Sequence, residues 1–192
     1  QCAGRRYSIA IARESGTPCP CRAMTQTRRL TFRDATLKDV AKIAAIQNAA
    51  SGALTARFGA GNWSTLVTER GATVSQRNSR VRLGVSDGRV WTVLRLATKK
   101  PWAIDVSYFT PVERPLYLTG MAVSVEHQGK GLGRLALEDA RVTAEAWPAN
   151  AIRLDAYDAE AGAGPFYVKC GFQERGRVVY KNDALIYYEL LL

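Results

Sequence analysis

The fold of this chain is decided by Val123-Ser-Val-Glu-His-Gln-Gly-Lys-Gly-Leu-Gly-Arg134. This stretch follows a mostly apolar run, Leu116 to Val123, and leads into a segment with helical periodicity, Leu132 to Trp147. Three glycines alternate at the junction. Glycine tolerates positive φ and the close approach of a ligand, and a helix start offers unpaired N–H groups and the positive end of the helix dipole. The junction therefore predicts an anion site suited to a pyrophosphate, with Lys130 and Arg134 at its rim.

Two other glycine-rich phosphate loops do not fit this spacing. A Walker A loop has Ser or Thr after its Gly-Lys pair, whereas Gly131 follows Lys130 here. The dinucleotide fingerprint separates its last two glycines by two residues, whereas only Leu132 lies between Gly131 and Gly133. A glycine-rich turn that binds no ligand remains the alternative.

Apolar periodicity predicts the other elements of the chain. Thr36 is expected to cap the first helix, with Asp39 three residues later. Asp87-Gly88 is a hairpin signal, and Lys181-Asn182-Asp183 separates the last two strands. The expected strands are 30–33, 81–85, 90–96, 102–109, 116–123, 152–157, 173–180 and 185–191. The first expected helix begins at 37, and the other three span 64–76, 132–147 and 165–170. This order predicts an α/β fold with a mixed sheet.

A second motif lies downstream, Ala163-Gly-Pro-Phe-Tyr167-Val-Lys-Cys-Gly171-Phe172. Together with residues 123–134, it resembles the GNAT superfamily of N-acetyltransferases. The acetyl-CoA signature of that family is Gln or Arg, then Gly-x-Gly, then Gly or Ala, after a hydrophobic strand. Its later segment is Ala-x-x-Leu/Phe-Tyr leading to Gly-Phe. The order of elements also fits, from Leu30 to the C-terminus. The resemblance implies a GNAT-like α/β fold with a mixed, mostly antiparallel central sheet and helices on both faces.

The resemblance also implies how the acyl donor is bound. In the family, the strand before the loop splays from the next one, and the thioester of acetyl-CoA lies in the gap. On this chain the two strands are Leu116 to Val123 and Ile152 to Tyr157. Acetyl-CoA is then the co-substrate, no metal is expected, and a primary amine of a small-molecule or peptide acceptor attacks directly, without a covalent enzyme intermediate. The implied cofactor-binding residues are Met121, Ala122, Val123, Gln128, Gly129, Lys130, Gly131, Leu132, Gly133 and Arg134.

Tyr167 is the catalytic residue that the resemblance implies. A phenol near the departing sulfur can act as the general acid and protonate the CoA thiolate. A core tyrosine packed beside Phe166 and Phe172 is the alternative. The general base stays open, because a protonated amine must lose a proton before it attacks. The candidate bases are Glu113, Glu126, His127, Asp155 and Asp158.

One position departs from the family pattern. An Asn often precedes the Ala-x-x-Phe-Tyr segment by three residues, and this chain has Glu160 there, whose carboxylate cannot donate as an amide does. The departure motivates a second hypothesis, a non-catalytic sensor that binds acyl-CoA. The acceptor is expected along residues 52–80 and 97–115, but the sequence does not identify it. Family members are often homodimers, and no sequence feature decides this for the chain.

The composition bounds the remaining possibilities. The 192 residues carry a net charge of +10, which fits an anionic ligand. Because the basic residues are dispersed, without a Lys/Arg block, the charge alone argues weakly for a third hypothesis, a nucleic-acid-binding module. No apolar run approaches the roughly 20 residues of a transmembrane helix. A cytoplasmic protein with unpaired thiols and no membrane contact is the expectation.

The first 23 residues differ in composition from the rest of the chain. They contain Gly, Pro, Arg and three of the four cysteines, with little periodicity. We expect a flexible extension at 1–23, or translated sequence upstream of a true start at Met24. Residues 24–192 are then a single acyl-CoA-dependent N-acyltransferase domain.

Overall fold

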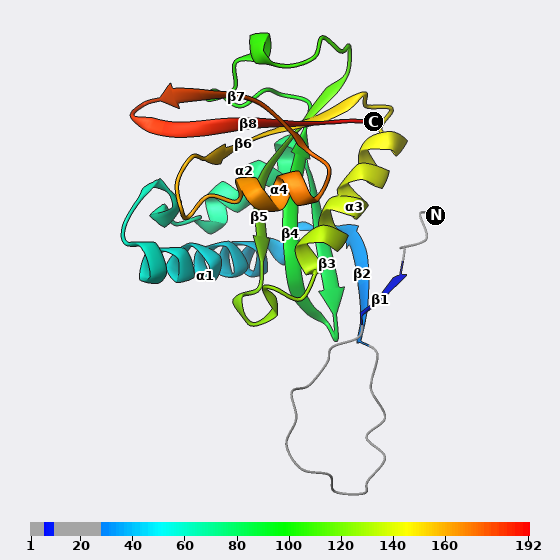
Figure 1. Ribbon diagram of the computed structural model, residues 1–192. Coiled ribbons are helices and arrows are strands. Elements are labelled where there is room, and N and C mark those ends of the chain that lie inside the picture. The colour runs from blue at the N-terminus through cyan, green and yellow to red at the C-terminus, as the bar shows by residue number, and fades with distance from the viewer. Residues whose placement is uncertain (1–5, 10–27) are drawn as a thin grey trace, which may run out of the picture.

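A computed structural model describes residues 6–9 and 28–192. In this part of the chain the strands form one eight-stranded sheet, in the order β1-β2-β3-β4-β5-β6-β8-β7 (Figure 1). The strands are β1 (Arg6–Ile9), β2 (Arg28–Asp34), β3 (Arg80–Ser86), β4 (Arg89–Ala97), β5 (Pro115–Val123), β6 (Ala151–Tyr157), β7 (Gln173–Tyr180) and β8 (Asp183–Leu191). The α-helices are α1 (Val40–Phe58), α2 (Glu69–Asn78), α3 (Leu132–Ala146) and α4 (Gly164–Lys169), and the 3-10 turns are η1 (Leu37–Asp39), η2 (Asn62–Ser64), η3 (Val106–Tyr108) and η4 (Val125–His127).

The sheet is mixed and mostly antiparallel, as the resemblance implied. Among the described strands, β5 and β6 are the parallel pair, and every other neighbouring pair is antiparallel. A parallel pair needs a crossover connection. Here α3 provides it, so the glycine-rich loop lies on the way from β5 to this helix.

Helices cover both faces of the sheet (Figure 1). Val93 of β4 packs in one core cluster with Ile43 of α1 and Ala72 of α2. Leu94, the next residue, belongs to a second cluster with Ala140 of α3. Successive strand residues point to opposite faces, so α1 and α2 lie on one face and α3 on the other. Helix α4 contributes to the same cluster as α3.

Local turn chemistry predicted both hairpins correctly. Asp87 and Gly88, between β3 and β4, have φ values of 50° and 72°. Lys181 and Asn182, between β7 and β8, have φ values of 50° and 71°. Two consecutive residues with positive φ are typical of the two-residue turns that match the twist of antiparallel strands.

Helix α2 begins later than the sequence predicted, at Glu69 rather than Ser64. The Asn48 side chain in α1 explains the difference. Its Nδ2 donates to the carbonyl oxygen of Val67 at 3.0 Å, and its Oδ1 accepts from the N–H of Val67 at 2.7 Å. Because Val67 is held by another helix, the new helix starts only after Thr68, whose hydroxyl caps it.

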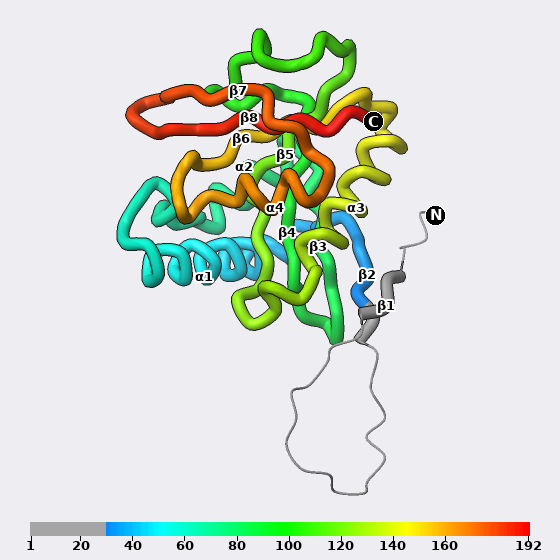
Figure 2. Tube along the Cα trace, viewed as in Figure 1, coloured from blue at the N-terminus to red at the C-terminus, as the bar shows by residue number. Residues whose placement is uncertain are grey.

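The strand predicted at 102–109 is wrong. In its place lie bends and the turn η3, in the loop at the top of Figure 2. The Tyr187 hydroxyl donates to the carbonyl oxygen of Ala103 and accepts from the N–H of Asp105 at 3.1 Å. The Asp105 carboxylate in turn accepts from the N–H of Ser107 at 3.0 Å. Side chains thus satisfy backbone groups that a strand would have paired with a neighbouring strand.

The expectation for residues 1–23 falls mostly outside the described residues. Of this segment the structure describes Arg6–Ile9, which forms β1 and pairs antiparallel with β2. Within 6–9 and 28–192, no helix has the length and apolarity needed to cross a membrane. The same ranges contain no cluster of three or more His, Cys, Asp or Glu side chains that could hold a metal ion.

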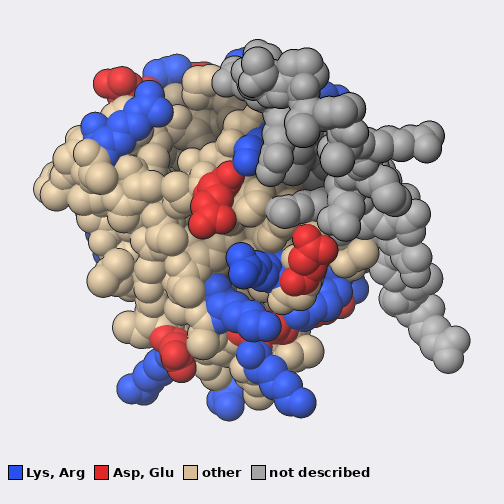
Figure 3. Space-filling view, turned by 90° about the horizontal axis from the view of Figure 1, so that it is seen from below, with Lys and Arg blue, Asp and Glu red and all other residues tan. Residues whose placement is uncertain are grey.

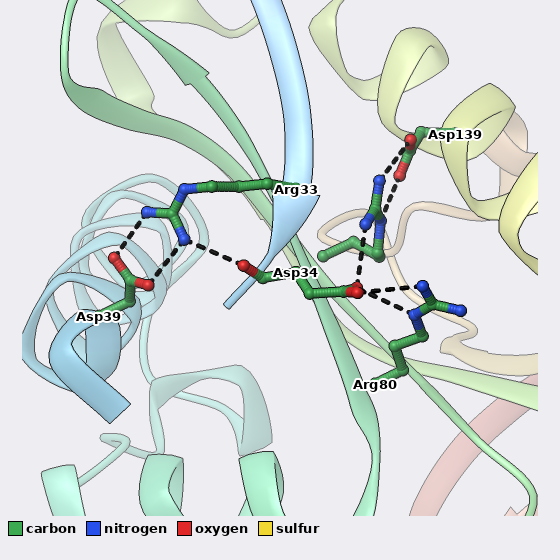
Figure 4. A network of polar contacts seen from close by, with 6 residues as sticks. Arg33, Asp34, Asp39, Arg80 and Asp139 are labelled. Atoms are coloured by element: carbon green, nitrogen blue, oxygen red, sulfur yellow. Dashed lines mark hydrogen bonds and ion pairs between the residues drawn. The ribbon is translucent and has the colours of Figure 1, made fainter. Parts of the chain in front are cut away.

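Bidentate ion pairs tie the sheet to its helices (Figure 4). The Nε and Nη2 atoms of Arg82 in β3 donate to Asp139 of α3 at 2.8 and 2.9 Å, and Nη1 donates to Asp34 at 2.9 Å. Arg33 of β2 donates to both oxygens of Asp39 at 2.7 Å. The hydrogen bonds from Arg33 hold the pKa of Asp39 below its usual range, although burial opposes this. The Asp39 carboxylate therefore stays ionised and bridges β2 to the start of α1.

Replacing Asp139 by Asn should destabilise the fold, because it leaves the Arg82 charge without its bidentate partner in a site where Asp139 is 3% exposed. We expect a loss of about 3 kcal/mol in the free energy of unfolding, measured by urea denaturation. The matched control is Glu138→Gln, next in the chain, whose exposed pair with Arg141 should be worth less than about 1 kcal/mol. Equal stability of the two variants would contradict a structural role for the Arg82–Asp139 pair.

Candidate active site

The glycine-rich loop connects β5 to α3 through two residues in the left-handed region. Gly129 has a φ of 73°, and Gly131, the N-cap of α3, has a φ of 79°. A Cβ added at either position would meet nothing within 4 Å. These two glycines are therefore required by the backbone, and the space beside the loop is open. An exposed loop with this conformation, at the start of a 15-residue helix, fits a pyrophosphate.

Charge around this loop is basic but mixed. Lys130 and Arg134 are both exposed. Lys130 Nζ donates to the carbonyl oxygen of Glu126 at 2.9 Å, so its charge is held over the loop. Seen from the end of the sheet where this loop lies, Lys and Arg side chains gather with Asp and Glu among them (Figure 3).

The third glycine of the loop has a packing role. A Cβ at Gly133 would lie 3.0 Å from the Phe166 ring and 3.6 Å from the Met121 side chain. The first turn of α3 therefore packs directly on α4 and β5. The two motifs that carry the family resemblance are brought into contact at this point.

Strands β5 and β6 separate soon after they start. Their pairing ends at Tyr117 and Arg153, although β5 continues to Val123 and β6 to Tyr157. Beyond that point β5 stays paired with β4, and β6 stays paired with β8. The edges that face each other therefore carry backbone groups without a strand partner, which a ligand can use.

A bulge in β5 lies where the strands diverge. Gly120 has a φ of 59°, and the register between β4 and β5 shifts between Val93 and Arg95. Gln47 of α1 donates from Nε2 to the carbonyl oxygen of Gly120 at 2.7 Å. A bulge redirects a strand and its side chains, and here α1 holds it in place.

A cleft of about 370 Å³ lies at the divergence. Its walls come from α1 and the following loop, from β5, and from β6 and the segment that leads to α4. The lining residues are Gln47, Ala50, Ser51, Leu54, Trp63, Thr65, Val67, Leu118, Thr119, Gly120, Met121, Ala122, Asp155, Ala156, Tyr157, Ala161, Ala163 and Tyr167.

Tyr167 lies at the inner wall of this cleft and is 8% exposed. Its hydroxyl lies 4.0 Å from Met121 Sδ, and its ring packs edge-on against Phe172 at 5.6 Å between centroids. Burial raises the pKa of Tyr167, and the charge of Asp155 raises it further. The phenol is thus neutral throughout the physiological range and keeps a proton to donate.

Residues 88–174 match the family model described as "Acetyltransferase (GNAT) domain". This range contains the glycine-rich loop, both diverging strands and Tyr167. This part of the chain is similar to the GNAT acetyltransferase domain. No curated protein sequence gives a significant match.

Solved structures share the fold of this chain at low sequence identity. A GNAT-family acetyltransferase of Listeria monocytogenes superimposes with a TM-score of 0.67 at 19% identity, covering 87% of this chain and 97% of that one. The acetyltransferase YncA of Salmonella typhimurium, solved with its cofactor acetyl-CoA, gives 0.63 at 19% identity and covers 85% and 94%. A ribosomal-protein-alanine N-acetyltransferase of Brucella melitensis gives 0.63 at 20% identity and covers 84% and 99%.

Of the five candidate bases, Asp155 lines the cleft. It lies on β6, two residues beyond the last residue paired with β5. Burial raises its pKa. A carboxylate with a raised pKa, beside the phenol of Tyr167, is suited to accept a proton.

The other candidate bases lie elsewhere. The His127 ring stacks on Trp91 at 3.9 Å, outside the cleft lining. Asp158 is bound by Arg177 at 2.8 Å. The remaining two, Glu113 and Glu126, are exposed outside the cleft.

Two further residues of the motifs can be placed. Glu160, at the position where the family often has Asn, is exposed in the turn after β6. Cys170 is half-buried, and burial raises the pKa of its thiol although Arg134 opposes this. A neutral thiol is a poor nucleophile.

Sequence reasoning missed two residues that line this cleft, Gln47 and Gly120. Gln47 carried no motif. Gly120 offered a usable signal, because a glycine inside an apolar strand often marks a bulge. The contact between Gln47 and Gly120 joins positions 73 apart, so no local pattern could have revealed it.

A buried ion network holds the loop that precedes β5. Glu189 of β8 is 1% exposed and pairs with Arg153 at 3.0 Å and Arg175 at 2.8 Å. It also accepts from the N–H of Thr110 at 3.2 Å, and Arg153 lies over the Phe109 ring at 4.9 Å. The segment before β5 is thus fastened to the sheet where β5 and β6 are still paired.

Gly120→Ala should destabilise the domain, because the new Cβ meets positive φ and lies 2.8 Å from Gln47 Nε2. We expect a loss of about 1–2 kcal/mol in urea denaturation. Gly52→Ala in α1, with no positive φ and nothing within 4 Å, is the control and should gain about 0.5–1 kcal/mol. If both variants change stability in the same direction, the bulge is not strained in this way.

Proposed function

We propose that the domain transfers an acetyl group from acetyl-CoA to a primary amine by direct attack. The observation that carries the proposal is the early separation of β5 and β6, with the glycine-rich loop at one end of β5 and Tyr167 in the cleft. The family match and the fold support acetyl transfer. The acceptor and the residue roles belong to the proposal.

The donor would be bound along β5 and the start of α3. The free edge of β5 at Met121, Ala122 and Val123 offers backbone groups to the pantetheine arm and the thioester carbonyl. The loop from Gln128 to Arg134 offers N–H groups to the pyrophosphate, and open space beside Gly129 and Gly131 supports this fit. The acetyl thioester supplies an activated acyl group.

Asp155 and Tyr167 would divide the proton transfers. Asp155 accepts a proton from the acceptor ammonium, and the neutral amine then attacks the thioester carbon. As the carbon–sulfur bond breaks, Tyr167 donates its proton to the leaving thiolate, so that the products are an acetamide and CoA with a neutral thiol. The raised pKa of Asp155 makes its carboxylate a stronger base, and the buried Tyr167 phenol is protonated before the step.

Acetyl-CoA should stabilise the protein against heat. At a hundredfold excess over Kd, about 2.7 kcal/mol of added stability corresponds to roughly 5–10 °C for a domain of this size. Gly131→Glu should abolish the shift by adding a side chain and a negative charge at the phosphate site. Gly59→Glu is the control, with the same open surroundings and a φ of 82°, and it should keep the shift. No shift of the wild-type protein with any acyl-CoA would exclude the proposal.

Tyr167→Phe should lower kcat by about 10²–10⁴-fold if the phenol is the general acid, while the thermal shift with acetyl-CoA persists. Release of free thiol across an amine panel provides the measurement. Tyr188→Phe removes another hydroxyl from the same aromatic cluster, 6.0 Å between ring centroids, outside the cleft lining. The kcat of this variant should stay within about threefold of the wild-type value. Thiol release by the wild-type protein would also exclude a non-catalytic sensor. An unchanged kcat in Tyr167→Phe would show that the tyrosine has a structural role.

A further inference from the structure

Arg95 of β4 is a half-buried cation without a carboxylate partner among the described residues. Its Nε donates to Thr119 Oγ1 at 2.7 Å, and its Nη1 donates to Ser75 Oγ at 2.5 Å. A guanidinium has five N–H donors, so three of them have no acceptor in this part of the chain. Burial lowers the pKa of Arg95, but arginine remains protonated.

The other well-buried arginines of the sheet are satisfied differently. Arg82 pairs with two carboxylates, and Arg153 pairs with the fully buried carboxylate of Glu189. Taking a cation out of water is costly unless an anion and hydrogen bonds compensate it. Neutral hydroxyls give Arg95 no such compensation.

Arg95 adjoins the cleft of the proposed reaction through Thr119, to which it is hydrogen-bonded. It is in register with Thr119, the residue before the Gly120 bulge. Thr119 lines the cleft, and so does Asp155 across the gap. Each lies two residues beyond the last β5–β6 pair, Tyr117 and Arg153. Since alternate residues of a strand share a face, Arg95, Thr119 and Asp155 face the same side of the sheet.

A pocket of about 140 Å³ extends from this point between α1, α2 and the sheet. Arg95 and Ser75 lie in its wall, and Gln47 and Gly120 line both this pocket and the cleft. The rest of its wall is apolar, formed by Ile43, Val67, Ala72, Val81 and Val93. A small apolar group beside an anion would fit such a pocket.

We propose that the amine acceptor is a free amino acid or a close analogue, whose carboxylate binds the Arg95 guanidinium while its amine faces Asp155 and the thioester. The proposal rests on the acetyl transfer proposed above. Two guanidinium N–H groups match the two oxygens of a carboxylate. The apolar pocket takes the side chain. A protein N-terminus fits less well, because its α-carboxyl group is part of a peptide bond.

The test separates acceptor recognition from transfer by measuring product binding. The probes are N-acetyl derivatives of leucine, methionine, phenylalanine and glutamate, each compared with its carboxyl amide by isothermal titration calorimetry in the presence of CoA. At least one acid should bind about 10–100-fold more tightly than its amide. In Arg95→Met this preference should fall to within about threefold. Arg95→Lys keeps the charge but not the pair of guanidinium N–H groups, and it should keep part of the preference.

The control variant is Arg89→Met, an exposed arginine at the start of the same strand, which should keep the full preference. Circular dichroism and the thermal shift with acetyl-CoA establish that each variant is folded. The proposal is overturned if no acid binds better than its amide, or if the preference survives in Arg95→Met.

Turnover of the free amino acids and their amides is measured separately. The amine of the amide is the less basic one, so a larger fraction of it is unprotonated and able to attack at neutral pH. A kcat/KM preference for the acid therefore cannot come from amine reactivity and supports recognition by Arg95. If thiol release occurs equally with amides, transfer stands and the role of Arg95 falls. If binding shows the Arg95-dependent preference without thiol release, the acceptor site stands and the transfer proposal falls.

Discussion

The cleft depends on the point at which β5 and β6 stop pairing. Each strand keeps its outer neighbour, so the sheet is continuous from the starts of β5 and β6 to Tyr117 and Arg153 and opens beyond them. Two sets of contacts fix this point. On the paired side, Arg153 and Glu189 form a fully buried ion pair. On the open side, Gln47 holds the carbonyl oxygen of Gly120 at the bulge. The position of every group around the cleft follows from where the strands diverge.

Elements specified by nearby residues were predictable from the sequence. Asp87-Gly88 specified a hairpin, and the alternating glycines from 129 to 133 specified a strand-to-helix junction, because φ and turn chemistry are local. The segment 102–109 was mispredicted as a strand because Tyr187, about eighty positions away, binds its backbone. The helix predicted from Ser64 begins later, at Glu69, for a similar reason, since Asn48 holds Val67. Asp155 became distinguishable from the other candidate bases only through its burial in the cleft.

The positive charge of the chain has two separate uses. Arg82 and Arg153 form ion pairs with buried carboxylates and stabilise contacts between the sheet, α3 and the loop before β5. Lys130 and Arg134 stay exposed at the glycine-rich loop. Arg95 belongs to neither set, since it is half-buried and bound by hydroxyls alone. A net charge of +10 is therefore a poor guide to function until each cation is placed.

The contact of Gly133 with the Phe166 ring has a consequence for how such domains can be recombined. Because a Cβ at 133 would lie only 3.0 Å from that ring, the loop that starts α3 and the helix that carries Tyr167 are fitted to each other. Exchanging one of these segments with that of a relative would bring a mismatched partner into a close-packed contact. Chimeras that alter donor preference must therefore move 123–134 and 163–172 as one cassette.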